Sequence, residues 1–101
     1  VKGEKKWVFP VDVDMPQKVE IDYWYNMVID RENSPVVIGG VETVTLGHGM
    51  KNEVCVHPYY GTQKVVDALK KYDQFEKGFI EFNDPPVAKR DPITNLVTEC
   101  F

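Results

Sequence analysis

Apolar and polar residues alternate along residues 19–29, where every odd position is apolar and most even positions are polar. A period of two is typical of a β-strand with one buried face. This stretch therefore predicts the best strand of the chain. Trp24 and Val28 interrupt the polar row, so we expect another part of the protein to cover some of the second face.

The next apolar runs predict a β-hairpin. Residues 36–38 and 41–46 are rich in β-branched side chains and flank Gly39 and Gly40. A glycine pair supplies the positive φ angles that a two-residue hairpin turn requires. Further short strands are predicted at residues 54–56, 78–82 and 96–101, with a proline-rich turn region at residues 83–92.

Only one segment predicts a helix, from Gln63 to Tyr72. Thr62 precedes it, and its hydroxyl is suited to accept a backbone N–H at the helix N-terminus. Apolar residues recur on one face of this segment, at Val65, Val66, Leu69 and Tyr72. We therefore expect a single domain over residues 1–101 that is mainly β, with one short helix near residues 63–72.

Size and charge narrow the classes of function. The chain has 101 residues, of which 43% are hydrophobic, and 12 Lys and Arg against 16 Asp and Glu give a net charge of −4. This is the size of one small domain, and scattered basic residues argue against nucleic acid as a partner. No apolar run approaches the roughly 20 residues of a membrane-spanning helix. We expect neither nucleic acid nor a membrane as a partner, and no cofactor.

The two cysteines, Cys55 and Cys100, form neither a disulfide framework nor a CxxC metal site. We expect unbonded thiols, which slightly favours the cytoplasm but does not establish a compartment. His48, Cys55 and His57 match no short-spaced zinc template, so no metal site is predicted. A nucleophilic pair of Cys55 with a histidine is chemically possible. However, a cysteine between two valines is more typical of a core position.

Both histidines lie in glycine-containing blocks. His48, between two glycines, could approach a peptide backbone closely and transfer a proton near neutral pH. Alternatively, it tightens a turn by bonding to the backbone, and the residues alone favour this structural role for His48 and for the pre-proline His57. The aromatic residues at 23–25 and 59–60 could form a binding platform, but packing explains them more simply.

Six blocks in order resemble the Vint group of Hint domains. They are WVFP (7–10), YNMVID (25–30), GVETVTLGHG (40–49), HPYYGT (57–62), VVDAL (65–69) and RDPIT (90–94). Hint domains are intein-like and hedgehog-like modules, compact and nearly all β, that cleave or rearrange their own backbone. The resemblance covers nearly the whole chain and implies a Hint-like β fold with autocatalytic protein-processing activity.

The resemblance also implies a mechanism and a partner. Such modules use an acyl shift from nitrogen to sulfur or oxygen at their first Cys or Ser, helped by a Thr-x-x-His block. This chain resembles the part that follows both groups, the C-terminal portion of the module. The implied partner is the N-terminal part of its own precursor or another protein, and the chain alone is expected to be inactive. Thr45 and His48, in the retained VTLGHG block, are the implied catalytic candidates.

Two departures from the family pattern leave the function open. The family usually has a histidine in the loop where this chain has residues 31–35, and a cysteine where this chain has Thr43. Both differences remove reactive groups, so a non-catalytic protein-interaction module is the alternative. A small hydrolase that uses Cys55 with His57 or His48 is a third hypothesis, which thiol modification would test.

Overall fold

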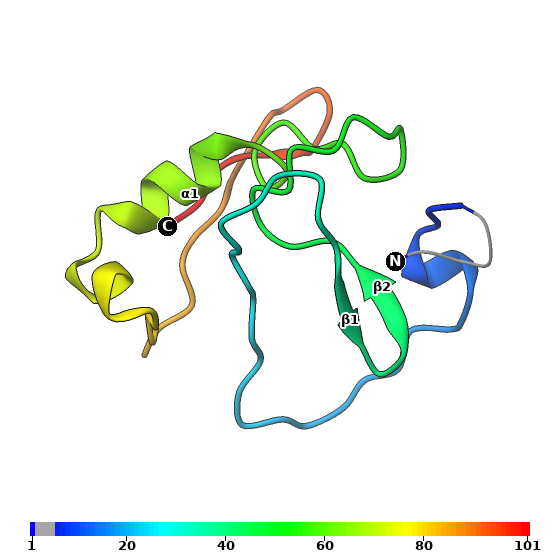
Figure 1. Ribbon diagram of the computed structural model, residues 1–101, viewed down its shortest axis with the longest axis horizontal. Helices are drawn as coiled ribbons and strands as arrows, with labels where there is room; N and C mark the ends of the chain where they lie inside the picture. Colours follow the sequence, from blue (N-terminus) through cyan, green and yellow to red (C-terminus); the bar gives the residue numbers. More distant parts are fainter. Residues whose placement is uncertain (2–5) are drawn as a thin grey trace.

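The computed structural model describes residue 1 and residues 6–101, and its regular elements are short (Figure 1). In this described part of the chain, two antiparallel β-hairpins and one α-helix are joined by long loops, which is consistent with the expected mainly β fold. The elements are η1 (Pro10–Asp12), β1 (Val36–Ile38), β2 (Val41–Thr43), α1 (Gln63–Lys70), η2 (Asp73–Lys77), β3 (Lys89–Arg90) and β4 (Val97–Glu99). Among the described residues, no helix has the length and apolar character needed to span a membrane.

The predicted hairpin between residues 36 and 46 is confirmed. Strands β1 and β2 pair antiparallel, with Val36 opposite Thr43 and Ile38 opposite Val41. The turn falls at Gly39 and Gly40, whose φ angles are 58° and 81°. The second strand ends at Thr43, three residues before its predicted end, because the chain there leaves the hairpin to form the site described below.

The predicted helix is also confirmed, as α1. The Thr62 hydroxyl accepts the backbone N–H of Lys64 and caps the first turn. The helix ends at Lys70 and not at Tyr72, because the next two N–H groups bond three residues back, in the tighter geometry of a 3-10 turn. Its buried residues, Val65 and Leu69, belong to the predicted apolar face.

The core joins α1 to the C-terminal strand, which runs close to the helix in Figure 1. Its buried members are Tyr59, Val65, Leu69, Val97 and Cys100. The Tyr59 hydroxyl donates a 2.6 Å hydrogen bond to the Cys100 carbonyl, which ties the end of the chain to this core. Cys55 and Cys100 are both free, as the sequence predicts, and both are buried.

The C-terminal strand predicted at residues 96–101 is present but shorter, as β4. Its partner, β3, lies within residues 83–92, where a turn region is predicted. The strand predicted at residues 78–82 is wrong. Gly78 ends η2 with a φ of 82°, and the Glu81 N–H bonds to the Gln74 side chain and not to a neighbouring strand.

The strands predicted at residues 54–56 and 19–29 are also wrong. The N–H groups of Cys55 and Val56 both donate to the Asn52 carbonyl, which curls this stretch into a turn. Within residues 19–29, only Val28 pairs, in an isolated parallel bridge with Leu46. Alternation indicates which side chains share a face, but a strand also needs a neighbour for its backbone groups, and no other described segment supplies one.

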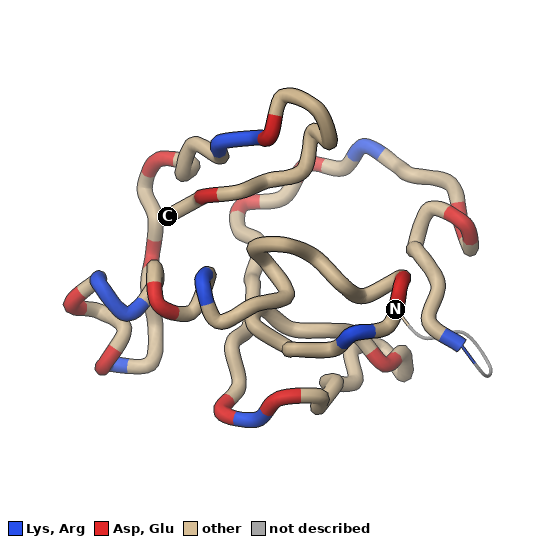
Figure 2. Tube along the Cα trace, turned by 90° about the horizontal axis from the view of Figure 1, so that it is seen from above, with Lys and Arg blue, Asp and Glu red and all other residues tan. Residues whose placement is uncertain are grey.

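Lys and Arg are interspersed with Asp and Glu along the folded chain (Figure 2). One cross-strand pair, Lys89 with Glu99, brings opposite charges to 3.4 Å, but both side chains are largely exposed. An exposed pair of this kind contributes at most about 1 kcal/mol. Packing of the core and the loop hydrogen bonds therefore determine the fold more than surface charge does.

Candidate functional site

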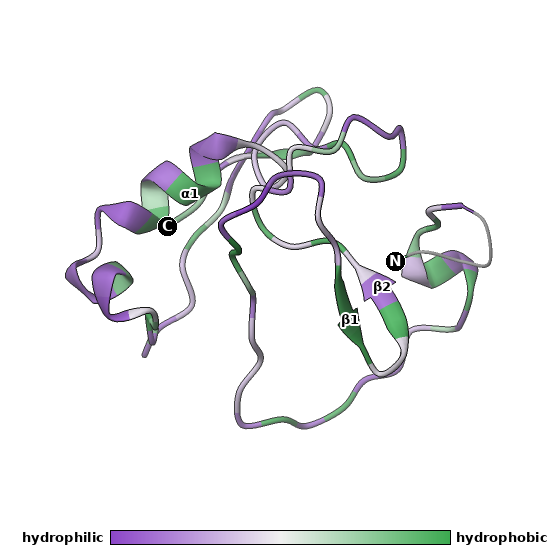
Figure 3. Cartoon of the chain, viewed as in Figure 1, coloured by the Kyte–Doolittle hydropathy of each residue, from purple (hydrophilic) through white to green (hydrophobic). Residues whose placement is uncertain are grey.

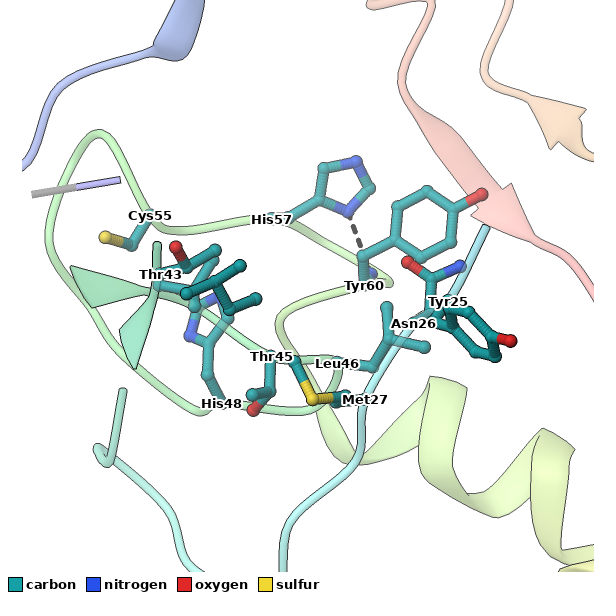
Figure 4. Close-up of a pocket in the computed structure, with 12 residues that line it drawn as sticks. Tyr25, Asn26, Met27, Thr43, Thr45, Leu46, His48, Cys55, His57 and Tyr60 are labelled. Atoms are coloured by element: carbon teal, nitrogen blue, oxygen red, sulfur yellow. Dashed lines mark hydrogen bonds between the residues drawn. The ribbon is translucent and has the colours of Figure 1, made fainter. Parts of the chain in front are cut away.

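A cleft of about 320 Å³ lies where the exit of β2 meets the loops on either side of it (Figure 4). Its walls come from residues 25–27, from Ile38, from residues 43–46, and from His48, Cys55, His57 and Tyr60. Both implied catalytic candidates, Thr45 and His48, lie in this cleft. Both histidines and one of the two cysteines of the chain are therefore gathered in one place.

Backbone N–H groups of residues 46–49 donate hydrogen bonds to two other segments, around Met27 and at residues 60–61. Leu46 and Gly47 donate to the carbonyls of Met27 and Tyr60 at 2.9 and 2.8 Å. Gly49 donates to the carbonyl of Gly61 at 3.0 Å. The turn that carries His48 is consequently fixed on both sides, although it contains no regular secondary structure.

The glycine before His48 has a specific physical reason. Gly47 has a φ of 69°, in the left-handed region that favours glycine. A Cβ at this position would also collide with the Val66 side chain of α1. The sequence Gly-His therefore lets the turn pass close to the helix while His48 enters the cleft wall.

His48 is buried, with only 3% of its surface exposed. Its Nδ1 accepts the N–H of Met50 at 2.9 Å, which places the ring proton on Nε2. Burial lowers the pKa of His48, while a hydrogen bond to the Cys55 backbone acts in the opposite direction. The imidazole is therefore neutral near pH 7 and engaged with the backbone of its own loop.

His57 has a similar arrangement one loop further on. Its Nδ1 accepts the N–H groups of Tyr59 and Tyr60 at 3.0 and 2.9 Å, and Figure 4 draws the second of these bonds. Burial lowers the pKa of His57, and repulsion by His48 lowers it further. Its ring also lies 5.0 Å from that of Tyr60, centroid to centroid. Both cleft histidines thus use Nδ1 as an acceptor for backbone donors.

Among the described residues of the cleft, Thr45 is the one whose buried side-chain oxygen has no hydrogen-bond partner. Its hydroxyl oxygen is closed to solvent and has no hydrogen-bond partner among the described residues. An unsatisfied buried hydroxyl costs about 1–3 kcal/mol. This cost favours any rearrangement or binding event that brings a hydrogen-bonding group to Thr45.

Two possible nucleophiles of the cleft, Cys55 and Thr43, are not activated. Burial raises the pKa of the Cys55 thiol, so the reactive thiolate is scarce at neutral pH. The Thr43 hydroxyl donates to the Val41 carbonyl at 3.3 Å. Within the part of the chain that the structure describes, no three His, Cys, Asp or Glu side chains are placed to hold a metal ion.

Sequence reasoning missed the residues that surround His48. Gly61 lies against the imidazole, so that a Cβ on Gly61 would stand 2.9 Å from both Cε1 and Nε2 of His48. The Asn33 N–H donates to the His48 carbonyl at 2.7 Å, and Glu32 lies against Gly49. Residues 31–35, which lack the histidine usual in the family, therefore contact the His48 turn directly. A glycine directly after two tyrosines is the sequence signal that could have indicated a close approach at Gly61. No feature of the neighbouring sequence indicates the contact of Asn33 with His48.

Comparison with known families places this chain among the Hint domains. The model of the Vint family, described as a Hint domain, matches residues 1–99. The chain therefore belongs to the Vint family, which confirms the resemblance and includes every residue of the cleft. No curated protein and no solved structure matches the chain significantly.

Proposed function

We propose that this chain is the scaffold portion of an autocatalytic protein-processing domain with a Hint-like β fold, and that it is inactive alone. Membership of the Vint family supports self-processing as the general activity. The observation that carries the location is the cleft in which Thr45 and His48 lie together. In this proposal the substrate is a peptide bond of the chain's own precursor.

His48 is in the protonation state that the proposed role requires. A neutral imidazole holds a backbone N–H on its unprotonated nitrogen, as Nδ1 does here with Met50. The same type of contact would place Nδ1 beside the nitrogen of a scissile amide, where it can take the proton that the attacking thiol or hydroxyl loses and pass it to the leaving amine during the acyl shift. The Met50 N–H occupies Nδ1, so His48 must release this N–H before it can accept the N–H of a scissile amide. This requirement supports inactivity of the isolated chain.

Thr45 supplies the second group of the proposed site. Its buried hydroxyl has no partner and is therefore free to donate to a peptide carbonyl or to the oxyanion that forms from it. A small opening of the cleft is required, because the oxygen is closed to solvent. The chain contributes a proton-transfer group and an oxyanion donor in this scheme.

The nucleophile comes from the partner in this proposal. Cys55 is held as a thiol and Thr43 is bonded to the backbone, so neither attacks a peptide readily. The N-terminal part of the chain's own precursor, which the family resemblance expects to begin with Cys or Ser, would supply the missing group. The acyl group moves from the peptide nitrogen to that sulfur or oxygen, and the nitrogen leaves as an amine once protonated.

The test is to supply the N-terminal part, in cis or as a separate chain, and follow release of a fused reporter with and without a thiol. His48→Ala is compared with His57→Ala, a matched control that removes the other cleft histidine. Thiol-dependent release that is lost in His48→Ala and kept in His57→Ala supports the proposal. Equal release in both variants, with folding checked by circular dichroism, removes His48 from the mechanism.

A non-catalytic interaction module is the second candidate. The observation in its favour is that the backbone engages the His48 ring and that Thr43 stands where the family usually has cysteine. No reporter release from a folded complex would support this candidate. Thr43→Cys then separates the two causes, because thiol-dependent release gained in this variant would show that the missing thiol alone had silenced a competent site.

A further inference from the structure

A long exposed segment, residues 13–27, precedes the first hairpin and is here called the arm. Six of its eight odd positions carry large apolar side chains that are each more than half exposed, at Val13, Met15, Val19, Ile21, Tyr23 and Tyr25. Figure 3 shows hydrophobic and hydrophilic residues interchanging along it. A row of large apolar side chains left exposed in this way is a candidate binding surface.

The backbone of the arm is also unpaired. Residues 16–26 make no backbone–backbone hydrogen bond with any residue that the structure describes. The arm is attached near its C-terminal end, where the Met27 carbonyl accepts the N–H of Leu46. A stretch with period-two alternation and free backbone groups has the properties of a strand that lacks its neighbour.

Between the apolar residues, most of the charged side chains of the arm are acidic. Its even positions include Asp14, Glu20 and Asp22 against a single base, Lys18. Side chains that lie opposite each other on adjacent strands interact directly, and like charges in that position destabilise the pair. A second copy of this chain would bring acidic rows together, so pairing between two arms is disfavoured, as it also is by the net charge of −4.

We infer that the arm is a docking surface for one β-strand of a polypeptide partner in which apolar residues alternate with Lys or Arg. The apolar row would be covered by the partner, and the basic residues would face Glu20 and Asp22. This inference deepens the proposed function, because the docked strand would belong to the polypeptide that completes the module. The inference rests on the proposed function only for the identity of the partner, because the docking surface itself is argued from the arm alone.

The experiment uses the whole 101-residue chain and two capped synthetic peptides of about eight residues, the length of a strand. One peptide alternates Val with Lys and the other alternates Val with Glu. Trp24, which is 69% exposed within the arm, reports docking through its fluorescence. We expect saturable binding of the Val-Lys peptide, weakened by salt, and no binding of the Val-Glu peptide.

Matched variants identify the surface. The variant Glu20→Gln with Asp22→Asn should bind the Val-Lys peptide about tenfold more weakly, and so should Ile21→Ser. Ile93→Ser is the control for the apolar change, because Ile93 is fully outside the arm and 93% exposed. The control for the charge change is Asp73→Asn with Glu76→Gln, in η2. Both controls should bind like the wild type.

Three results would overturn the inference. They are equal binding of both peptides, no binding of either, and dimerisation of the free chain at the concentrations used, seen by sedimentation. Because no reporter is cleaved in this experiment, its outcome is independent of the processing assay. Docking without cleavage would leave this inference intact while the proposed activity failed, and cleavage without docking would do the reverse.

Discussion

Replacing Gly61 with alanine tests the packing of His48 most directly. The backbone of Gly61 is outside the left-handed region, so an alanine brings no backbone strain of its own. Its Cβ, however, would stand 2.9 Å from two imidazole atoms of His48 and 3.3 Å from the backbone nitrogen of His57. The ring cannot easily retreat, because it is 3% exposed and its Nδ1 holds the Met50 N–H.

The expected cost follows from two opposing effects. Overpacking of a well-packed site lowers the free energy of unfolding by about 1–3 kcal/mol. Alanine also has less conformational freedom than glycine in the unfolded chain, which raises the free energy of unfolding by about 0.4–1 kcal/mol. We expect Gly61→Ala to lower the free energy of unfolding by about 1–2 kcal/mol. At about 4–8 °C per kcal/mol for a domain of this size, the melting temperature should fall by about 4–16 °C.

The assay is urea and thermal unfolding followed by circular dichroism, in four chains that form a double-mutant cycle. In the His48→Ala background the added methyl group has no ring to meet, so its cost should largely disappear. Gly39→Asn is the control for glycine replacement, since nothing lies within 4 Å of a Cβ there and asparagine tolerates a positive φ. An equal cost of Gly61→Ala with and without the imidazole would refute the packing described here.

Three further predictions concern the surroundings of the cleft. Acidification from about pH 7 to about pH 5 should lower the urea midpoint of unfolding. Burial lowers the pKa of His48 and His57 in the folded chain. Below about pH 6.5 the histidines of the unfolded chain therefore bind protons before those of the folded chain, which favours the unfolded state. A flat profile would contradict this. Thr62→Ala removes the helix cap and should cost about 1 kcal/mol in urea unfolding; no change would mean that water replaces it. Tyr59→Phe leaves the buried Cys100 carbonyl without its donor and should cost about 1–3 kcal/mol in the same assay. A neutral result would show that this bond is dispensable.

The sequence predicted correctly those elements whose cause is local. The turn at Gly39 and Gly40 depends on the φ angles of two adjacent residues, and the start of α1 depends on a hydroxyl at Thr62 that reaches its own first turn. Both signals lie within a few positions of the structure that they specify. They therefore remain valid whatever the rest of the chain does.

The failed strands had causes that lie elsewhere in the chain. Cys55 is buried, as its apolar neighbours suggest, but the Asn52 carbonyl curls its backbone and prevents pairing. The pattern of residues 19–29 specifies two faces without specifying a neighbour. If the arm docks as inferred above, the strand prediction describes the complex and not the free chain, and the error is one of context.

The candidate site shows the same division between local and distant causes. The motif placed Thr45 and His48 together, since three positions separate them, but it could not show that Gly61 lies against the imidazole or that Met50 holds its Nδ1. These contacts bear on the proposed activity. A histidine that already holds a backbone N–H is neutral and oriented for a peptide, yet it must release that donor before it can accept another. The energy for this exchange has to come from binding, because the Met50 N–H is buried and would be costly to leave unpaired. A partner that both docks on the arm and presents an amide at the cleft could meet this cost, which would restrict processing to the completed module.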